Sequence, residues 1–388
     1  MPTEDSVSQE APRQFPHRTI MTTLQDEKVP QIRIVSYNIL STEYAGADYY
    51  VNTPPEHLQT SYRWGLLRTR LEAELKANSV VCLQEVTPTW DELLIPFFHH
   101  HGYTLVSGPK ADGKMGVSIA VPRDLQVAET KIVKVGDRLR ARASARKYET
   151  KIPLVGPWLD AIANRAVVPA VDLYDTTRTR AGRLLGWPSW FNHLPQHHDG
   201  WEASMKRDNS LVFVRVRPQG TSVELCVGTY HMPCKFRCPD IMTLHASMVK
   251  DLMFEMARTT PFVLAGDFNI TPRDPVYRML TQGENCDHLL KESLRHTVTW
   301  RPDYRQVVKS AYVTKLGSEP PFTNYAHTAR SAPFRDTLDY VFYSGVEVID
   351  VVALPATPDD VERGVRSFPC TTEPSDHLMV GATFRIGA

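Results

Sequence analysis

Nine short β-rich runs, separated by loops and helical patterns, constrain the fold of this chain more than any other feature of its sequence. Each run is bounded by Gly, Pro, Asn or Asp, the residues that end strands and form turns. The predicted strands are 31–38, 79–85, 115–121, 210–216, 223–230, 261–267, 337–344, 346–354 and 378–384. Since the chain has 388 residues, it is long enough to bury a sizeable core around them.

The connections between the runs predict how the strands are arranged. Apolar residues at spacings of three and four predict helices over 64–75 and 241–256, the second with Asp240 as its N-cap. Strand–helix–strand units of this kind join parallel strands, whereas the short link RPQGTS between 210–216 and 223–230 predicts an antiparallel hairpin. The mixture predicts two packed sheets with helices outside them, not one doubly wound parallel sheet.

Polar residues end or interrupt these apolar runs. They are Asn38, Glu85, His231, Asp267, Asn269, Asp339, Asp376 and His377. A carboxylate at the edge of a buried strand is costly unless another group pairs with it or a metal ion binds it. Because adjacent strand ends converge in space, we expect these side chains to form one site. The alternative is a set of scattered buried hydrogen bonds.

Composition narrows the class of protein. Forty-four Lys and Arg balance forty-four Asp and Glu, so any binding of nucleic acid must come from a local patch. No stretch reaches the ~18 apolar residues of a membrane span, and the start, MPTEDSVSQEAPRQF, lacks the apolar core of a secretory signal. Six cysteines favour a reducing compartment. We expect the cytoplasm, with the nucleus as the alternative.

Two segments depart from the strand and helix pattern. Residues 1–30 are polar and without period, which predicts a flexible tail. Residues 123–209 have weak periodicity, and 131–183 carries twelve Lys and Arg against five Asp and Glu. This insertion is either a basic surface for a phosphate-rich ligand or a solvated excursion anchored by its tryptophans. On the first interpretation, its candidate substrate-binding residues are Arg138, Arg140 and Arg142.

Six short strings resemble, in their order along the chain, the motifs of the endonuclease/exonuclease/phosphatase superfamily. They are SYNIL (36–40), LQEV (83–86), TYHMP (229–233), GDFN (266–269), LDYVFYS (338–344) and SDH (375–377). The segments YRWGLLRTRLEAELKANSVVCLQEV and KSAYVTKLGSEPPFTNYAHT look most like the nocturnin, Angel and Ccr-Not-type deadenylase branch. The resemblance implies one catalytic domain over 31–388, folded as a four-layer αββα sandwich of two mixed, mainly antiparallel sheets (DNase I-like). It also implies a divalent-metal phosphoesterase.

Attack on a phosphodiester requires neutralisation of the phosphate charge, and the sequence offers oxygen donors for a cation. Glu85 is the leading ligand, with Asn38 beside it and Asp376 bound directly or through water. Magnesium prefers such oxygen ligands and keeps several waters. We therefore expect Mg²⁺ as the cofactor, with Mn²⁺ as the alternative.

The other polar residues suit the proton transfers of hydrolysis. Asp267 fits a general base that orients the attacking water, and Asn269 has an amide suited to a phosphate oxygen. His231 and His377 are expected to donate to the phosphate. Asp339 is expected to hydrogen-bond His377 and favour its charged form. Turn-forming and purely structural roles are the alternatives for Asn38, Asn269 and Asp339.

The substrate is the least constrained part of the prediction. Asn209 matches a branch position near the substrate. Phe322 and Tyr325 are candidates to stack a base, although packing is the favoured role for both. The leading hypothesis is a magnesium-dependent phosphodiesterase acting on RNA, a 3′ exonuclease or deadenylase. The alternatives are hydrolysis of a small nucleotide or a phospholipid headgroup, and a non-catalytic binding module on the same fold.

Overall fold

The computed structural model describes residues 29–109, 115–145, 199–293, 295–329 and 332–387. The tail predicted over 1–30 and the middle of the basic insertion, 146–198, lie outside these residues except for positions 29 and 30. Within the described part of the chain, no helix is both long and apolar enough to cross a membrane.

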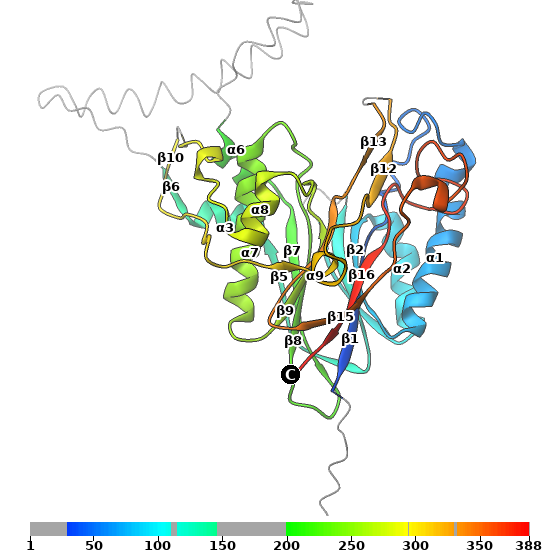
Figure 1. Ribbon diagram of the computed structural model, residues 1–388, viewed down its shortest axis with the longest axis horizontal. Helices are drawn as coiled ribbons and strands as arrows, with labels where there is room; N and C mark the ends of the chain where they lie inside the picture. Colours follow the sequence, from blue (N-terminus) through cyan, green and yellow to red (C-terminus); the bar gives the residue numbers. More distant parts are fainter. Residues whose placement is uncertain (1–28, 110–114, 146–198, 294, 330–331, 388) are drawn as a thin grey trace, which may run out of the picture.

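Two six-stranded sheets form the centre of the molecule (Figure 1). Sheet A has the order β15 (Glu347–Val351), β16 (Val380–Arg385), β1 (Gln31–Asn38), β2 (Val80–Val86), β4 (Gly116–Pro122) and β3 (Tyr103–Pro109). Sheet B has the order β11 (Lys309–Ser310), β14 (Asp339–Ser344), β9 (Phe262–Asp267), β8 (Leu225–His231), β7 (Ser210–Pro218) and β5 (Leu125–Lys134). Only the pairs β1–β2 and β8–β9 are parallel within these two sheets; the other pairs are antiparallel.

The sheets pack face to face because their strands alternate between two apolar surfaces. On β1, Ile32 and Ile34 point into a core shared with Val212 and Val214 of β7, whereas Val35 and Tyr37 point to the other face. Apolar residues therefore lie on both faces of the two sheets, and helices must cover the outer ones.

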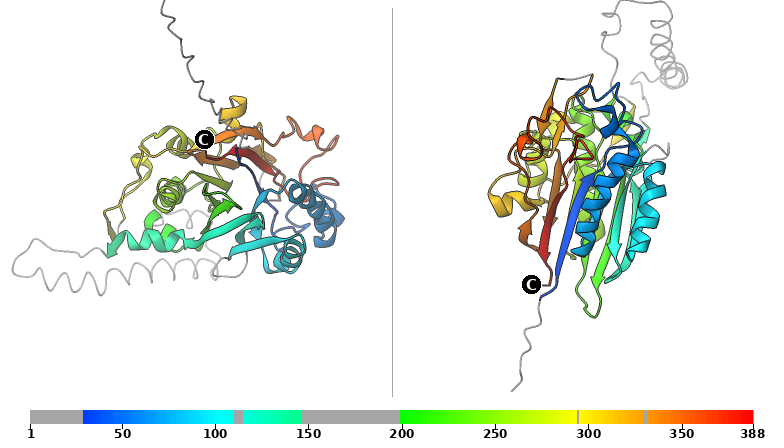
Figure 2. Two further views of the ribbon diagram at one scale, coloured as in Figure 1. Left: turned by 90° about the horizontal axis from the view of Figure 1, so that it is seen from below. Right: turned by 90° about the vertical axis from the view of Figure 1, so that its right-hand side faces the viewer.

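Helices form the two outer layers, as Figure 2 shows from two further directions. The outer face of sheet A packs against α1 (Thr60–Lys76) and α2 (Pro88–His100). The outer face of sheet B packs against α3 (Val135–Ala141), α6 (Gly200–Met205), α7 (Pro239–Ala257) and α8 (Pro275–Gln282). This α–β–β–α order confirms the predicted fold class.

Smaller elements complete the fold. The helix α9 (Ala311–Leu316) packs on β14 and β15. Two short strand pairs are β6 (Ala143–Ala145) with β10 (His296–Val298), and β12 (Asn324–Ala326) with β13 (Phe334–Asp336). The pair β12–β13 projects from the upper end of the sandwich in Figure 1. Single 3₁₀ turns lie at Pro55–Leu58, Asp287–Leu289 and Pro358–Asp360.

All nine predicted strands are present, and the structure corrects the sequence analysis at three points. Asp240 is not an N-cap: α7 begins at Pro239 after Cys238, because proline fits the first helical turn, where its missing N–H is not needed. The strands β3 and β5 were not predicted. Since β5 and α3 lie within 123–209, the first part of the predicted insertion belongs to the sandwich itself.

Candidate active site

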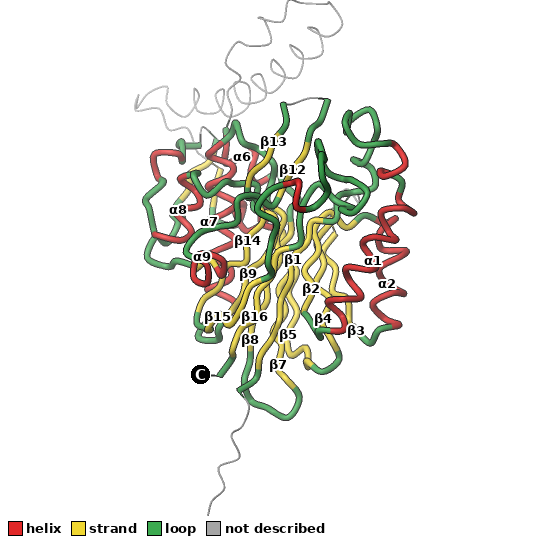
Figure 3. Tube along the Cα trace, turned by 45° about the vertical axis from the view of Figure 1, so that its right-hand side comes forward, coloured by secondary structure: helices red, strands yellow, loops and turns green. Residues whose placement is uncertain are grey.

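The polar residues singled out in the sequence converge at one end of the sandwich. Asn38 ends β1, Glu85 lies next to the end of β2, and His231 and Asp267 end the parallel strands β8 and β9. Asp339 begins β14, whose antiparallel register places it directly beside Asp267. Figure 3 shows the strands of both sheets running toward this common end. We call these strand ends, with the loop that carries Asp376 and His377, the catalytic end.

The side-chain amide of Asn38 joins the two sheets. Its Nδ2 donates to Glu85 Oε1 of sheet A at 3.1 Å and to Asp267 Oδ2 of sheet B at 3.0 Å. The Oδ1 atom of the same amide accepts from Leu40 N at 3.0 Å, which fixes the orientation of the group. The carboxylates of Glu85 and Asp267, which come from different sheets, are therefore both bonded to one amide nitrogen.

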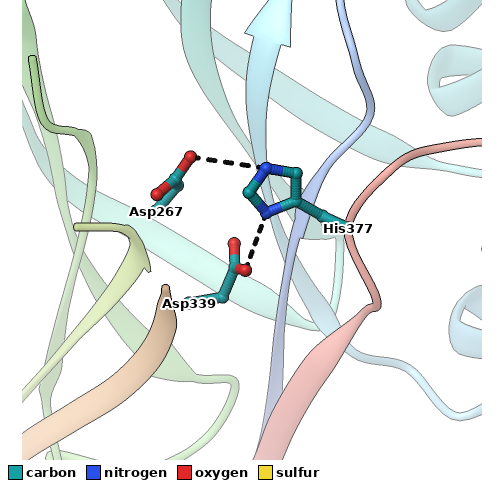
Figure 4. Close-up of side chains that lie close together, drawn as sticks. All are labelled: Asp267, Asp339 and His377. Carbon is teal, nitrogen blue, oxygen red and sulfur yellow. Dashed lines mark hydrogen bonds and ion pairs between the residues drawn. The ribbon is translucent and has the colours of Figure 1, made fainter. Parts of the chain in front are cut away.

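His377 lies between two carboxylates, as Figure 4 shows. Its Nδ1 bonds Asp339 Oδ2 at 2.8 Å, and its Nε2 faces Asp267 Oδ2 at 3.8 Å. Thr323 Oγ1 donates to Asp339 Oδ2 at 2.6 Å and fixes that carboxylate. Burial opposes the charged ring, but Asp339, Asp376 and Asp267 outweigh it and raise the pKa of His377 well above its usual value. The ring is therefore an imidazolium at neutral pH.

Asp267 is buried and contacts both histidines. Its Oδ2 lies 3.4 Å from His231 Nε2, and its Oδ1 accepts from Asn269 N at 2.9 Å. Burial raises the pKa of Asp267 to about 6, against the opposing charge of His377. A carboxylate with this pKa is deprotonated at neutral pH and is a stronger base than an ordinary aspartate. The amide of Asn269 itself donates to Met232 O at 3.0 Å, so one of its two N–H groups is engaged by the protein.

The backbone is strained where the functional side chains leave it. Among the described residues, five non-glycine residues have positive φ, and Leu40, Glu85 and Asn269 of the catalytic end are three of them. Glu85, with φ of 62°, is also the bulged residue of β2, between the partners Gln84 and Val86. A bulge of this kind re-aims a side chain, and left-handed backbone at non-glycine residues concentrates at functional sites.

Glu85 and Asp376 are the other two carboxylates of the catalytic end. Glu85 is half-buried, and its Oε2 accepts from Ser41 N at 2.7 Å. Burial would raise the pKa of Glu85, but the charge of His231 and the bonds from Ser41 and Asn38 lower it, so the group is ionised. Asp376 Oδ1 is buried with no hydrogen-bond partner. A buried carboxylate oxygen without a partner is costly unless it receives a ligand, and hard cations such as Mg²⁺ take oxygen ligands.

A second group of metal-ligating atoms lies at the same end. One ligand atom each of Asp267, Asp339 and His377 lies within 4.8 Å of the others. However, His377 Nδ1 is hydrogen-bonded to Asp339 Oδ2. Because the pKa of the ring is raised, both ring nitrogens carry protons and neither has a free lone pair for a metal. The hydrogen bond from His377 to Asp339 and its proximity to Asp267 suit proton transfer, which leaves Glu85 and Asp376 as the remaining candidate cation donors.

The predicted substrate-binding residues are more dispersed. Asn209 Nδ2 donates to His231 O at 2.7 Å, which places it at the catalytic end. Phe322 is fully buried against Phe368 and Leu378, so no base can stack on it; the structure shows the favoured role, packing. Tyr325 is half-buried, and its ring meets Phe368 edge-on at 5.5 Å between centroids.

The three candidate arginines lie on the outer face of sheet B. Arg138 and Arg142 form ion pairs with Glu255 of α7, at 2.7 and 3.6 Å. Arg140 binds Asp137 at 2.6 Å and the carbonyl of Met205 at 2.6 Å. The structure does not bring these side chains together with the catalytic end.

The sequence analysis missed two aromatic residues beside the site. Phe236 is 55% exposed, and its ring lies 6.3 Å from that of Phe334. Phe236 follows β8, and Phe334 lies on β13, just before β14. Cys234 lies in the same loop as Phe236. Desolvation and the charges of Asp267 and other site carboxylates raise the pKa of its thiol to about 12, which shows that this loop borders the site. Phe236 lies five residues after His231, and Phe334 lies five residues before Asp339. This closeness in sequence to two predicted site residues was the available signal.

Comparison with known proteins adds a family match. The model of the Endonuclease/Exonuclease/phosphatase family matches residues 35–377. A Saccharomyces cerevisiae protein named CCR4-Not complex 3'-5'-exoribonuclease subunit Ccr4 is 22% identical over 382 residues, which cover 90% of this chain and 38% of the yeast protein. The human protein named 2',5'-phosphodiesterase 12 is 23% identical over 384 residues, 94% of this chain and 53% of that protein. The chain thus spans between two fifths and about half of these relatives.

Solved structures show the same fold. ANGEL2, described as a 2',3'-cyclic phosphatase and solved with adenosine-2',3'-vanadate, matches with a TM-score of 0.62 and 19% identity, over 92% of this chain and 96% of that one. The human Nocturnin catalytic domain with a bound sulfate matches with a TM-score of 0.54 and 16% identity, over the same shares of the two chains.

Proposed function

The chain belongs to the endonuclease/exonuclease/phosphatase family, and from this premise we propose that it is a divalent-metal-dependent phosphodiesterase that hydrolyses RNA from its 3′ end. The predicted resemblance to the nocturnin, Angel and Ccr-Not-type branch is confirmed by the relatives. The observation that carries the proposal is the junction at Asn38, which holds Glu85 one amide away from Asp267. A cation-binding carboxylate and a base are then adjacent, as phosphoryl hydrolysis requires.

We propose Mg²⁺ as the cofactor, with Mn²⁺ as the alternative. Glu85 and Asp376 would hold the ion, the latter through its unpartnered Oδ1. Asn38 Oδ1 would add a neutral oxygen donor. When bound, the ion neutralises charge on the phosphate and lowers the pKa of its water.

The chain's own residues would move the protons. Asp267, deprotonated above its pKa of about 6, accepts the proton of the attacking water through a carboxylate oxygen. The charged His377 ring donates from Nε2 toward the phosphate, while Asp339 holds Nδ1 and prevents the ring from turning. His231 lies on the other side of Asp267 and offers a second donor. These groups stabilise charge that grows in the transition state.

RNA is favoured over a small nucleotide by the surface around the catalytic end. Phe236 offers an exposed aromatic face, Arg237 is exposed in the same loop, and Arg335 is exposed on β13, next to Phe334. Aromatic faces flanked by cations are typical of single-strand binding, since bases stack and phosphates pair with the charges. The names of the Ccr4 relatives, 3'-5'-exoribonuclease subunits of a CCR4-Not complex, agree with this substrate. We propose the cytoplasm as its location, with the nucleus as the alternative.

The test is hydrolysis by the purified chain and by Glu85→Gln, which keeps the size of the side chain but removes its charge. Poly(A) RNA, 2′,5′-oligoadenylate and a nucleoside 2′,3′-cyclic phosphate would be compared with and without Mg²⁺. We expect Mg²⁺-dependent shortening of poly(A) from the 3′ end by the wild type, and loss of activity by orders of magnitude in the variant. Activity restricted to the cyclic phosphate would contradict the RNA substrate, and no activity on any of them would contradict the enzyme.

A further inference from the structure

Arg63 is a buried arginine on the apolar face of a helix. It lies on α1, four residues before Leu67 and eight before Leu71, and all three side chains are almost completely buried. A charged residue in such a position is rarely found unless it is paired, because burial of an unpaired charge costs several kcal/mol. Burial lowers the pKa of Arg63 to about 10, so the guanidinium remains charged at neutral pH.

The guanidinium binds backbone carbonyls and no carboxylate. Its Nε donates to Pro374 O at 2.6 Å, and its Nη2 donates to Ile39 O and Leu40 O. The ring of Trp90 lies 5.1 Å from the guanidinium carbon, and Trp90 Nε1 also donates to Leu40 O, at 3.0 Å. A rigid planar group with several donors suits this geometry, and a lysine ammonium does not reproduce it.

These carbonyls belong to the two loops that carry the proposed cation donors. Ile39 and Leu40 follow Asn38, and the next residue, Ser41, gives its N–H to Glu85. Pro374 precedes Ser375, whose hydroxyl donates to Asn38 O at 2.6 Å, and then Asp376. Leu40 has φ of 52°, a conformation that a leucine adopts only when its surroundings hold it. Arg63 thus holds both loops together, and the charges of Asp376 and Glu85 are among those that favour its charged form.

We propose that Arg63 is a positioning residue for the divalent-cation site: it fixes the loop after Asn38 to the loop before Asp376 and places a buried positive charge behind the two cation-binding carboxylates. This inference rests on the proposed function for the identity of the cation. The residue touches neither substrate nor cation, so it acts only through the geometry and charge of Glu85 and Asp376.

A second buried cation provides a matched control. Lys250 of α7 is also fully buried, and its Nζ donates to the carbonyls of Asp303 and Gln306, in a loop on the outer face of sheet B. Loss of either cation leaves carbonyls without a donor and lowers stability. Of these two cations, Arg63 is the one that faces the catalytic end.

The experiment compares Arg63→Lys with Lys250→Met in the full chain. The first readout is the rise in melting temperature that Mg²⁺ or Mn²⁺ causes in the protein without substrate, titrated to give the metal affinity. The second is kcat and KM for poly(A) at saturating metal. We expect both variants to melt at a lower temperature than the wild type without metal. We expect Arg63→Lys alone to lose metal affinity, by about 10- to 100-fold, as for other residues that orient ligands, with kcat reduced more than KM is raised.

A third variant guards against misfolding of Arg63→Lys. Trp90→Phe keeps an aromatic ring over Arg63 but removes the N–H that binds Leu40 O, and it should lower metal affinity in the same direction by a smaller factor. Wild-type metal affinity in Arg63→Lys, or in Trp90→Phe if the first does not fold, would overturn the inference. Absence of metal binding by the wild type would instead overturn the proposed function, so the two failures are distinguishable.

Discussion

Two buried histidines, one at the catalytic end and one on the inner face of α7, show how differently the same side chain is used in this molecule. His377 lies between Asp339 and Asp267, and these carboxylates raise its pKa. His245 lies on the buried face of α7, where its Nδ1 pairs with Tyr230 Oη at 2.7 Å. Burial lowers the pKa of His245 to about 3, so the ring is neutral.

The difference teaches which buried polar groups indicate function. Both ring nitrogens of His245 have neutral partners, since Nε2 lies 3.3 Å from Ser204 O, and the one buried side-chain oxygen without a partner beside it is the neutral hydroxyl of Ser204. At the catalytic end, by contrast, the buried oxygens without partners belong to carboxylates, the Oδ1 atoms of Asp339 and Asp376. Charge held in the core, unpartnered oxygens and left-handed backbone at Glu85 coincide there. Burial of a histidine alone would not separate the two regions.

The largest expected effect comes from removing the proposed base. Asp267→Asn keeps the size of the side chain but cannot accept a proton, so kcat for poly(A) should fall by about 10²- to 10⁴-fold, with a much smaller change in KM. The measurement is single-turnover hydrolysis at saturating RNA. His245→Gln is the matched control from the other region, and its kcat should stay within a few-fold of wild type. Near-wild-type kcat in Asp267→Asn would move the base elsewhere.

A smaller effect is expected at the aromatic residues beside the catalytic end. Phe236→Ala removes an exposed face on which a base can stack, an interaction worth about 1–3 kcal/mol. KM for poly(A) should therefore rise by roughly 5- to 150-fold, while hydrolysis of a chromogenic phosphodiester without a base stays unchanged. Ile95→Ala, at a similarly exposed apolar residue of α2, is the control. Equal loss on both substrates would show that Phe236 only shapes the site.

The sequence predicted the catalytic end better than its surroundings, for a physical reason. Asn38, Glu85, Asp267 and Asp339 stand directly at the ends of apolar runs, and strand topology then brings them together. The bond between Asp339 and His377 also agrees with the prediction. The orientation of Glu85 by a bulge could not be predicted, because bulges depend on the register of β2 against β4.

The surroundings of residues outside strand ends are harder to predict, because they depend on distant segments. Phe322 becomes buried only because Phe368 and Leu378 pack on it. Arg138 and Arg142 meet Glu255, more than a hundred residues away in the chain. The strand β5 is a half-exposed edge strand with alternating burial, so its apolar residues are too few to form a continuous run. In each case the decisive interaction is long-range, and the local pattern of the sequence does not indicate it.

The two histidines should also give stability opposite dependences on pH. His245 is neutral when folded but protonates near pH 6.5 when unfolded, so its contribution to the free energy of unfolding is present above pH 6.5 and is lost as pH falls toward 3. His377 has a raised pKa, so its contribution is complete below pH 6.5 and is lost as pH rises through the folded value.

Thermal unfolding of His245→Gln and His377→Gln across pH 5 to 9 checks these signs. The difference in melting temperature from wild type should shrink toward acid pH for His245→Gln and toward alkaline pH for His377→Gln, by a few degrees in each case. Parallel curves for the two variants would contradict the assignment of one neutral and one charged ring.

The smallest effect is expected from the basic residues that the sequence analysis assigned to RNA. α3 begins beside Asn209, where Val135 N donates to Asn209 O at 3.1 Å, yet the guanidinium groups that follow turn to protein acceptors on the outer face of sheet B. Arg138 and Arg142 share Glu255, and Arg140 binds Asp137. A cation that already has a carboxylate partner gains little from a phosphate, because it must give up one ion pair to form the other. Neutralising Arg138, Arg140 and Arg142 together to Gln should therefore leave KM for poly(A) and its dependence on salt almost unchanged.

The comparison variant neutralises Lys235 and Arg237, in the loop between β8 and α7 that carries Phe236. For each phosphate that no longer binds a cation, the slope of log affinity against log salt should fall by about 0.7 for a single strand, so this double variant should show a visibly flatter slope. The measurement is KM for oligoadenylate over a salt series with the three proteins side by side. If the triple arginine variant flattened the slope and the loop variant did not, RNA would follow the outer face of sheet B. The polynucleotide surface would then extend along α3, and the separation between the catalytic end and the region around α7 would not hold for substrate binding.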